Sequence, residues 1–260
     1  IDTKPFLRHL TYYDLKKNMI SVVVPVFNEG SNIDYVITET ISVLKKIGNK
    51  YEIIFVDDGS TDESFKILID RAGKNTSIKV ISFSRNFGQQ AAYTAGMRHS
   101  SGDTIILMDG DQQDPPSLIP SFIEKINEGY DVAYAVRLNR EGNLLKKLSY
   151  FCFYRVLKIL TPYDIPLDSG DFGAITRRVA NHLNSMPEKN RFLRGLRSYV
   201  GFRQAAVPYK RKNRILGEPK YNFFKLLGLA SDGIFGFSLL PLRLATISGF
   251  FVSFLAILYG

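Results

Sequence analysis

The sequence predicts an α/β fold with a mostly parallel sheet and helices on both faces. Between residues 20 and 99, apolar strand segments alternate three times with segments of helical pattern. The strands are apolar along their whole length, as expected of parallel strands that are buried on both faces. Each strand also ends in a short polar or acidic segment, which is where an α/β sheet places its functional residues.

The expected elements follow in order. The first strand is rich in β-branched residues, and Pro25 indicates either the end of this strand or an edge position in the sheet. Ser60 and Glu63 form a predicted capping box at the start of the second helix. The predicted strands are 20–27, 51–56, 78–83, 103–107 and 131–136; the predicted helices are 32–47, 60–72, 87–99, 117–127 and an amphipathic helix at 144–160.

An acidic segment follows the fourth strand, with Asp109 and Asp111 two positions apart. In an extended chain this spacing directs both carboxylates to the same side of the backbone, and Gln113 continues the same parity. Two carboxylates and an amide supply only oxygen ligands, which suit Mg²⁺ or Mn²⁺. We therefore predict a metal site at Asp109, Asp111 and Gln113, with an acidic surface turn as the alternative.

Four strand ends carry residues that are unusual for simple connections: 25–29 (PVFNE), 57–59 (DDG), 84–88 (SRNFG) and 109–111 (DGD). Any one of them is compatible with ordinary loop chemistry. Because parallel strands end at the same edge of a sheet, the four together predict a binding site there. No strand is followed by GxGxxG or GxxxxGK[ST], which argues against a dinucleotide-binding fold and a P-loop fold.

The 260 residues carry a net charge of +9 that is unevenly distributed. Residues 137–225 contain 19 Lys and Arg against 6 Asp and Glu, whereas the rest of the chain contains 15 against 19. This excess predicts an anionic partner such as phosphate, nucleic acid or a lipid surface, with a solvated basic face as the alternative. Cys152 is the only cysteine and the three histidines are scattered, so a reducing compartment fits and neither residue type forms a metal site.

The C-terminal segment 241–260 is about long enough to cross a bilayer once and has a single charge, Arg243. We expect a transmembrane helix, with a buried core helix as the alternative, and we expect the full protein to continue beyond it. The N-terminus shows no secretory signal. The expected domains are an N-terminal extension 1–18, a catalytic domain 19–221, juxtamembrane interfacial helices 222–240 and a transmembrane helix 241–260.

Four motifs carry a family resemblance: 22–29 (VVVPVFNE), 56–62 (VDDGSTD), 85–88 (RNFG) and 109–115 (DGDQQDP). In this order and spacing they resemble glycosyltransferase family 2, whose fold is the Rossmann-like GT-A fold. More narrowly, the chain is similar to membrane-bound polyprenyl-phosphate glycosyltransferases, which include bactoprenol glucosyltransferases and dolichol-phosphate mannose synthases. The resemblance extends from residue 20 to nearly the end of the chain.

The second half contains further motifs of this group in 169–172 (SGDF), 191–201 and the basic loop 209–221, with two departures. Gly173 stands where the family usually has an arginine, and Tyr199 replaces a tryptophan. The family's QxxRW motif, which marks processive polymer synthesis, is absent.

The resemblance implies roles for individual residues. Asp109, Asp111 and Asp171 are the expected catalytic residues. The expected contacts of the nucleotide sugar are Pro25, Phe27, Asn28, Glu29, Asp57, Asp58, Arg85, Gly88 and Asp109, and the expected contacts of the acceptor phosphate are Arg137, Arg194, Arg211, Arg214 and Lys220.

The implied reaction is an inverting, metal-dependent transfer of a hexose from a nucleotide-diphosphate sugar, UDP-glucose being favoured, to polyprenyl (undecaprenyl) phosphate. It would take place at the cytoplasmic face of the inner membrane, with the lipid bilayer as a partner, and a homo-oligomer is compatible with the sequence. A lipid phosphate is already anionic near neutral pH, because its second pKa is about 6, so we expect Asp171 to position groups rather than to take a proton. The alternatives are a non-lipid glycan or lipopolysaccharide acceptor on the same fold and, remotely, a basic nucleic-acid-binding module, although no aromatic residues are interleaved with the basic run as stacking platforms.

Overall fold

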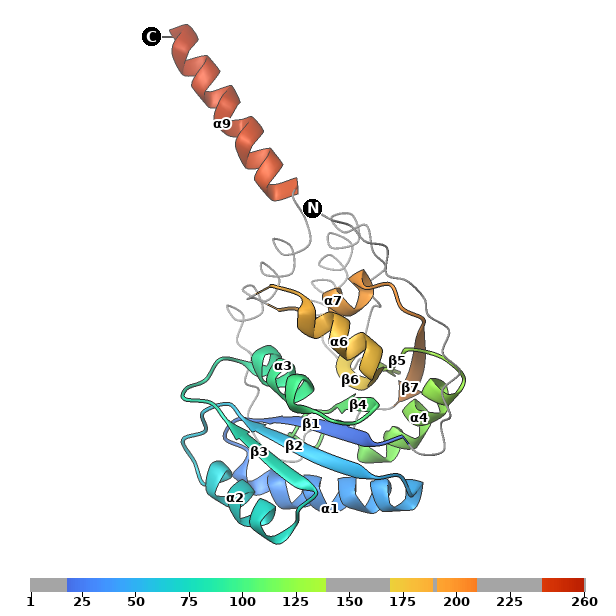
Figure 1. Ribbon diagram of the computed structural model, residues 1–260. Coiled ribbons are helices and arrows are strands. Elements are labelled where there is room, and N and C mark those ends of the chain that lie inside the picture. Colours follow the sequence, from blue (N-terminus) through green and yellow to red (C-terminus); the bar gives the residue numbers. More distant parts are fainter. Residues whose placement is uncertain (1–17, 139–168, 189–190, 210–239, 260) are drawn as a thin grey trace. The chain divides into compact units, whose positions relative to one another are not determined.

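The computed structural model describes residues 18–138, 169–188, 191–209 and 240–259. The chain divides into two compact units, residues 1–140 with 168–217 and residues 141–167 with 218–260. The first unit holds the sheet and its helices (Figure 1), and in the second only helix α9 is described. The predicted helix 144–160, Cys152, most of the N-terminal extension, most of the basic loop and the segment 222–239 lie outside the described residues.

A seven-stranded mixed sheet with the order β3-β2-β1-β4-β6-β5-β7 forms the centre of the first unit. Strand β6 (Ser169–Thr176) runs antiparallel to β4 and β5, and the other neighbouring pairs are parallel. The expected α/β fold with a mostly parallel sheet is therefore confirmed. The remaining strands are β1 (Ile20–Val26), β2 (Tyr51–Asp57), β3 (Ile78–Ser82), β4 (Thr104–Leu107), β5 (Val132–Arg137) and β7 (Gln204–Tyr209).

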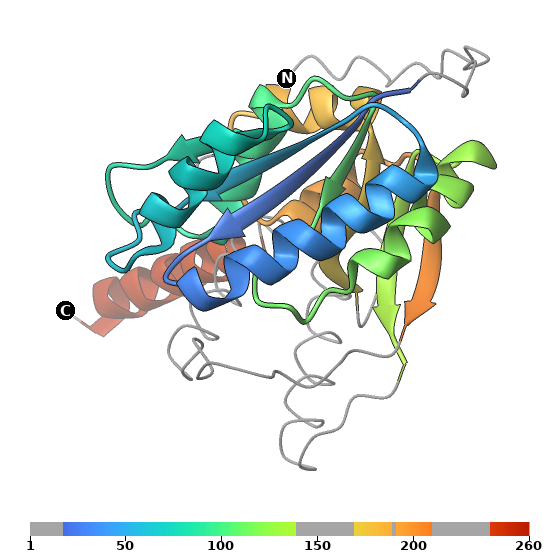
Figure 2. The ribbon, with the colours of Figure 1, turned by 90° about the horizontal axis from the view of Figure 1, so that it is seen from below.

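Helices cover both faces of this sheet (Figures 1 and 2): α1 and α2 lie together on one face, and α3 and α6 lie on the other. Side chains alternate between the faces along β1, so Val22 and Val24 join the core that contains α1, whereas Val23 faces α3. A Cβ on Gly96 of α3 would lie 2.1 Å from Val23 Cγ1, so glycine permits this close approach. The helices of this unit are α1 (Gly30–Ile47), α2 (Ser64–Lys74), α3 (Gln89–His99), the 3₁₀ turn η2 (Pro116–Leu118), α4 (Ile119–Asn127), α6 (Arg177–Ser185) and α7 (Leu193–Tyr199).

Pro25 lies in a central strand, so the edge interpretation is wrong and the strand-end interpretation is right. Strand β1 pairs with β2 as far as Val26 but with β4 only as far as Val23. Pro25 therefore lies beyond the last residue paired with β4, where a missing N–H removes no ladder bond on that side.

The predicted capping box is also wrong, because α2 begins at Ser64 and the Ser60 hydroxyl has another partner. Ser60 Oγ accepts a hydrogen bond from the Asn28 N–H at 3.0 Å. The Asp62 carboxylate instead accepts from the N–H groups of Ser64 (2.9 Å) and Gly30 (3.2 Å). Burial alone would raise the pKa of Asp62, but hydrogen bonds, first from the Ser64 side chain and then from these backbone N–H groups, outweigh it and lower the pKa. The segment before α2 is thus tied to the start of α1.

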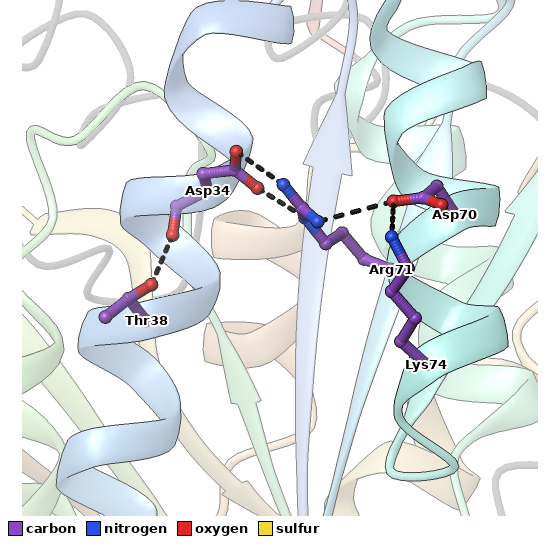
Figure 3. A network of polar contacts seen from close by, with 5 residues as sticks. All are labelled: Asp34, Thr38, Asp70, Arg71 and Lys74. Atoms are coloured by element: carbon purple, nitrogen blue, oxygen red, sulfur yellow. Dashed lines mark hydrogen bonds and ion pairs between the residues drawn. The ribbon is translucent and has the colours of Figure 1, made fainter.

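An ion-pair network on the surface joins α1 to α2 (Figure 3). The Arg71 guanidinium donates to both carboxylate oxygens of Asp34, from Nε at 2.7 Å and from NH2 at 2.9 Å. Arg71 also contacts Asp70, which pairs with Lys74 at 2.7 Å. The hydrogen bond from Arg71 lowers the pKa of Asp34. Because these groups are largely exposed, the network orients the two helices more than it stabilises them.

Helix α9 (Leu240–Tyr259) exposes large apolar side chains, including Phe250 and Ile257, which are 76% and 78% exposed. Within the part of the chain that the structure describes, no helix combines the length and apolar character of a membrane span. The expected transmembrane helix at 241–260 is therefore not confirmed and stays a prediction.

Candidate active site

The parallel strands β1, β2, β3 and β4 end at the same edge of the sheet, and the predicted segments follow them there. Hydrogen bonds then join these segments to one another. The Asp58 N–H donates to the Val26 carbonyl at 2.8 Å, and the Met108 N–H donates to the Val23 carbonyl at 3.1 Å. The segments at 25–29, 57–60, 84–88 and 109–114 therefore follow strands that end at one edge of the sheet.

The segment after β1 is held in place by its own side chains. Asn28 has the positive φ of 53° that asparagine tolerates, and its Oδ1 accepts from the Thr61 N–H at 2.8 Å. Glu29 Oε2 accepts from Asn32 Nδ2 at 2.5 Å. Phe27 is half-buried, as is Pro25. These contacts shape the first loop of the site before any ligand binds.

Asp57 and Asp58 are both buried; Asp57 binds the end of β3, and Asp58 binds the loop that follows this strand. Asp57 accepts from the Ser82 hydroxyl at 3.2 Å, whereas Asp58 accepts from the N–H groups of Phe87 (2.7 Å) and Gly88 (2.9 Å). Burial raises the pKa of Asp58, although these two N–H groups act in the opposite direction. Asp58 therefore fixes the loop that carries Arg85.

Glycine is required where this loop meets the segment after β2. Gly59 has φ 70°, and a Cβ on it would lie 2.6 Å from the carbonyl carbon of Arg85. The Arg85 guanidinium lies over the Phe87 ring at 4.0 Å from its centroid, and Gly88, with φ 94°, precedes α3. Arg85 and Gly88 are thus placed beside Asp58 at the edge of the sheet.

The acidic motif follows β4, but the parity argument fails beyond the strand. The sheet ladder ends at Leu107, and Gln112 adopts a left-handed conformation with φ 62°. The Asp111 Oδ1 accepts from the backbone N–H of Gln113 at 3.1 Å, and Gln112 Nε2 donates to Asn32 at 2.7 Å. A turn around Asp111, rather than extended alternation, arranges this motif.

Two residues of α3 donate hydrogen bonds to Asp109. Its Oδ1 accepts from the Tyr93 hydroxyl at 2.6 Å and from Gln89 Nε2, and its N–H donates to the buried Asp114. Tyr93 is fully buried, which raises its pKa well above the ordinary value, and the charges of Asp109 and Asp171 raise it further. The Tyr93 hydroxyl therefore stays a neutral donor at physiological pH.

Asp171 on β6, whose charge contributes to the raised pKa of Tyr93, is only 9% exposed. Its Oδ2 accepts from Gln90 Nε2 at 2.9 Å, and its Oδ1 accepts from Arg194 Nε at 3.2 Å. Arg197, which is 5% exposed, also attracts Asp171, and its guanidinium lies over the Tyr134 ring at 4.9 Å. The structure thus surrounds Asp171 with one amide and two cations.

Arg137 ends β5 beside this group. Its NH2 lies 3.9 Å from the position that a Cβ on Gly170 would occupy, and its Nε is buried without a hydrogen-bond partner among the described residues. A Cβ on Gly173 would lie 2.4 Å from the Ala133 carbonyl oxygen. The departure from arginine at Gly173 is therefore explained by close pairing between β6 and β5.

The donor set of the acidic motif fits a hard divalent cation. Asp109 and Asp111 are half-buried carboxylates and Gln113 is a half-buried amide, and oxygen donors of these two kinds are the ligands that Mg²⁺ and Mn²⁺ take. Among the described residues, no three His, Cys, Asp or Glu side chains form a metal cluster. The predicted set contains only two such residues together with Gln113.

Several residues of the site were not predicted from the sequence. Gln89, Gln90 and Tyr93 occupy the first turns of the helix that follows the RNFG segment, and Arg197 lies on α7. The position of α3 directly after a strand-end motif was the available signal for the first three. Arg211, Arg214 and Lys220 lie outside the described residues.

Comparison with known proteins identifies the family. Residues 21–183 match the family Glycosyl transferase family 2. The chain is 46% identical to the "Uncharacterized glycosyltransferase YkcC" of Bacillus subtilis, over 97% of this chain and 76% of that protein. It is 39% identical to the "Bactoprenol glucosyl transferase" of Shigella phage SfV and 38% identical to the "Prophage bactoprenol glucosyl transferase homolog" of Escherichia coli, each over 93% of this chain and 79% of the relative.

Solved structures support the same fold. Mannosyl-3-phosphoglycerate synthase from Rubrobacter xylanophilus superposes with a TM-score of 0.59 at 16% identity, over 89% of this chain and 75% of that chain. Glucosyl-3-phosphoglycerate synthase from Mycobacterium tuberculosis, in complex with Mn²⁺, UDP and phosphoglyceric acid, gives 0.56 at 19% identity, over 82% and 75%. The nucleic-acid-binding interpretation is thereby set aside. The chain belongs to glycosyl transferase family 2 and is a glycosyltransferase with a GT-A-like α/β fold.

Proposed function

We propose that the enzyme transfers a hexose, with inversion, from a nucleotide-diphosphate sugar to polyprenyl phosphate, and that UDP-glucose and undecaprenyl phosphate are its substrates. The relatives named bactoprenol glucosyl transferase, at 38% and 39% identity over 93% of the chain, support this acceptor. The observation that carries the proposal is that Tyr93 interacts with two unlike groups. The Tyr93 hydroxyl donates to Asp109 of the acidic motif, and the charge of Asp171 raises the pKa of Tyr93. Arg194 and Arg197 in turn attract Asp171.

In this proposal the loops near Asp109 bind the nucleotide sugar, and the arginines near Asp171 bind the acceptor phosphate. The loops after β1, β2 and β3 would hold the nucleotide through Pro25, Phe27, Asn28, Glu29, Asp57, Asp58, Arg85 and Gly88. Asp57 and Asp58 would act mainly by fixing these loops, since both are buried and hydrogen-bonded to them. Arg137 and Arg194 would fix the acceptor phosphate, together with Arg211, Arg214 and Lys220, because arginine forks match phosphate oxygens.

Asp109, Asp111 and Gln113 would hold Mg²⁺ or Mn²⁺. The glucosyl-3-phosphoglycerate synthase neighbour was solved with Mn²⁺ and UDP, which is consistent with a cation in this fold. When bound, the cation supplies positive charge to the departing nucleoside diphosphate. Tyr93 and Gln89 orient Asp109 toward this role by binding its Oδ1.

Asp171 would orient the reactants rather than act as a general base. A lipid phosphate is an anion near neutral pH, because its second pKa is about 6, so its oxygen can attack without losing a proton. The Asp171 carboxylate is held by Gln90 and Arg194 from two different helices. These contacts fix its position beside Arg194, where it would direct the guanidinium toward the phosphate.

We also propose that the catalytic unit works at the cytoplasmic face of the inner membrane. The exposed apolar side chains of α9 support association with a bilayer, because such a surface is unfavourable in water. In this proposal residues 19–221 form the catalytic domain, 222–240 lie at the interface and 241–260 insert. The excess of basic residues after residue 137 would contact anionic headgroups.

The test is a transfer assay in detergent with each labelled nucleotide sugar, undecaprenyl phosphate and a divalent cation. The proposal predicts label in the lipid extract with UDP-glucose, and less with other nucleotide sugars. Label in a non-lipid glycan, with none in the lipid, would show that the acceptor proposed here is wrong. The assignment to the family would remain unchanged.

A further inference from the structure

Gln90 joins three elements of the site through one side-chain amide. Its Nε2 donates to Asp171 Oδ2 on β6 at 2.9 Å, and its Oε1 accepts from the Leu193 N–H at the start of α7, also at 2.9 Å. Gln90 itself lies in the first turn of α3. The side chain therefore uses a donor and an acceptor at the same time, on two different elements.

These contacts close a ring around Asp171. Leu193 precedes Arg194, and Arg194 Nε donates to the other oxygen of Asp171 at 3.2 Å. The ring runs from Gln90 to Asp171, to Arg194 and back to Gln90 through the Leu193 N–H. Both oxygens of Asp171 are bound, one by Gln90 and one by Arg194 at the start of α7. Gln90 therefore contacts both the carboxylate and the backbone of the helix that carries Arg194.

The chemistry of the ring requires a neutral amide. A carboxylate at position 90 would accept from the Leu193 N–H but would have no proton for Asp171, and an aliphatic side chain would serve neither. The side chain of Asp171 is 6% exposed and that of Arg194 is 26% exposed, so water replaces a lost partner poorly at Asp171.

We propose that Gln90 is a positioning residue that acts through Asp171 and Arg194. It holds the start of α7 against Asp171 and thereby sets the orientation of the Arg194 guanidinium toward the acceptor. This inference rests on the proposed function for the identity of the reaction. The hydrogen bonds of Gln90 to Asp171 and Leu193 do not depend on the proposed function, so they can be tested separately.

Two substitutions distinguish positioning from simple packing. Gln90→Leu removes both hydrogen bonds. Gln90→Glu keeps the length and, when its new carboxyl is protonated, can donate to Asp171 and accept from the Leu193 N–H; when ionised, it repels Asp171. Two carboxyls at hydrogen-bond distance titrate as a pair, and one proton is retained to a higher pH than in an isolated carboxyl. Among the described residues, Arg194 and Arg197 from α7 and Tyr93 from α3 are the other charged or titratable groups that interact with Asp171.

The kinetic test measures kcat and KM of the full chain for UDP-glucose and undecaprenyl phosphate over roughly pH 5 to 8. Gln90→Leu should lower kcat about tenfold or more at every pH while the KM for UDP-glucose changes little, since a hydrogen bond to a charged group is lost. Gln90→Glu should approach the wild-type rate at the acidic end and fall toward Gln90→Leu as the pH rises. Equal, pH-independent losses in the two variants would overturn the proposal, as would wild-type kcat in Gln90→Leu.

The second readout is thermal unfolding without substrates. In Gln90→Glu the folded state raises the pKa of the new carboxyl above its unfolded value, so its stability is highest at low pH and is lost as the pH rises through the folded pKa. The Tm difference from wild type should therefore grow with pH, whereas that of Gln90→Leu should stay constant. A constant Tm difference in Gln90→Glu would overturn the contact. If the wild type transfers no hexose to lipid, the proposed function fails, and this measurement still decides the role of the Gln90 amide.

Discussion

Replacing Arg197 by methionine removes a buried charge and keeps an unbranched side chain of similar length. Arg197 is 5% exposed, and its Nε and NH2 have no hydrogen-bond partner among the described residues. Burial, partly offset by the attraction of Asp171, lowers the pKa of its guanidinium from its ordinary value to about 10. The folded state therefore disfavours this charge, although the site keeps it.

The magnitude follows from this pKa. At about 1.36 kcal/mol per pH unit, this lowering of the pKa corresponds to roughly 3 kcal/mol by which the folded state disfavours the charged form. Methionine would lose the stacking on the Tyr134 ring, worth about 1 to 2 kcal/mol at a desolvated site. We expect Arg197→Met to be about 1 to 2 kcal/mol more stable than wild type, which raises Tm by roughly 3 to 6 °C in a domain of this size.

Hexose transfer should change in the opposite direction. Without the second cation beside Asp171, we expect kcat to fall about tenfold, equivalent to about 1.4 kcal/mol. The matched control is Arg203→Met, because Arg203 lies over the Tyr130 ring at 5.0 Å but is exposed. Thermal unfolding of the control should show no gain in stability, and its kcat should be unchanged. A less stable Arg197→Met, or one with full activity, would refute the reasoning.

Three further predictions follow from the site. Asp111→Ala should abolish transfer without a large change in Tm, because Asp111 lies in a surface turn, and EDTA should have the same effect on wild type; full activity in EDTA would contradict the metal proposal. Asp171→Asn should retain appreciable activity with an unshifted pH profile if Asp171 only positions groups, whereas a loss of about a hundredfold or more would indicate a general base. Gly173→Ala should destabilise the fold by about 1 to 3 kcal/mol in denaturant unfolding, because its Cβ would lie 2.4 Å from the Ala133 carbonyl oxygen; an unchanged midpoint would contradict the close pairing.

The first half of the fold was predictable because its signals are local. The strands β1, β2 and β4 each contain an uninterrupted apolar run (22–26, 53–56 and 105–107), and each precedes a recognisable polar segment. Strands β6 and β7 were not predicted, because SGDFGAIT and QAAVPY contain glycine, alanine and proline and pair only with distant segments. Short-range patterns do not encode such pairing.

The candidate site also contains residues that local motifs indicate and residues that only the folded chain brings together. Asp109, Asp111 and Asp171 became candidate site residues from their motifs alone, whereas Gln90 and Arg197 join the candidate site only when α3, β6 and α7 come together. The parity argument assumed an extended backbone, but the chain bends at 110–112, and the left-handed Gln112 turns it between Asp111 and Gln113. The capping box failed because Ser60 binds Asn28, a partner 32 positions away.

The central claim is that the acceptor is a lipid phosphate, and one competition measures it directly. The purified full chain, with labelled UDP-glucose and Mg²⁺ or Mn²⁺, is offered undecaprenyl phosphate, undecaprenol without phosphate and a soluble glycan in equal amounts. The account predicts that the label enters undecaprenyl phosphate alone and that the product releases its sugar in mild acid. Label in undecaprenol or in the glycan, with none in the lipid phosphate, would contradict it.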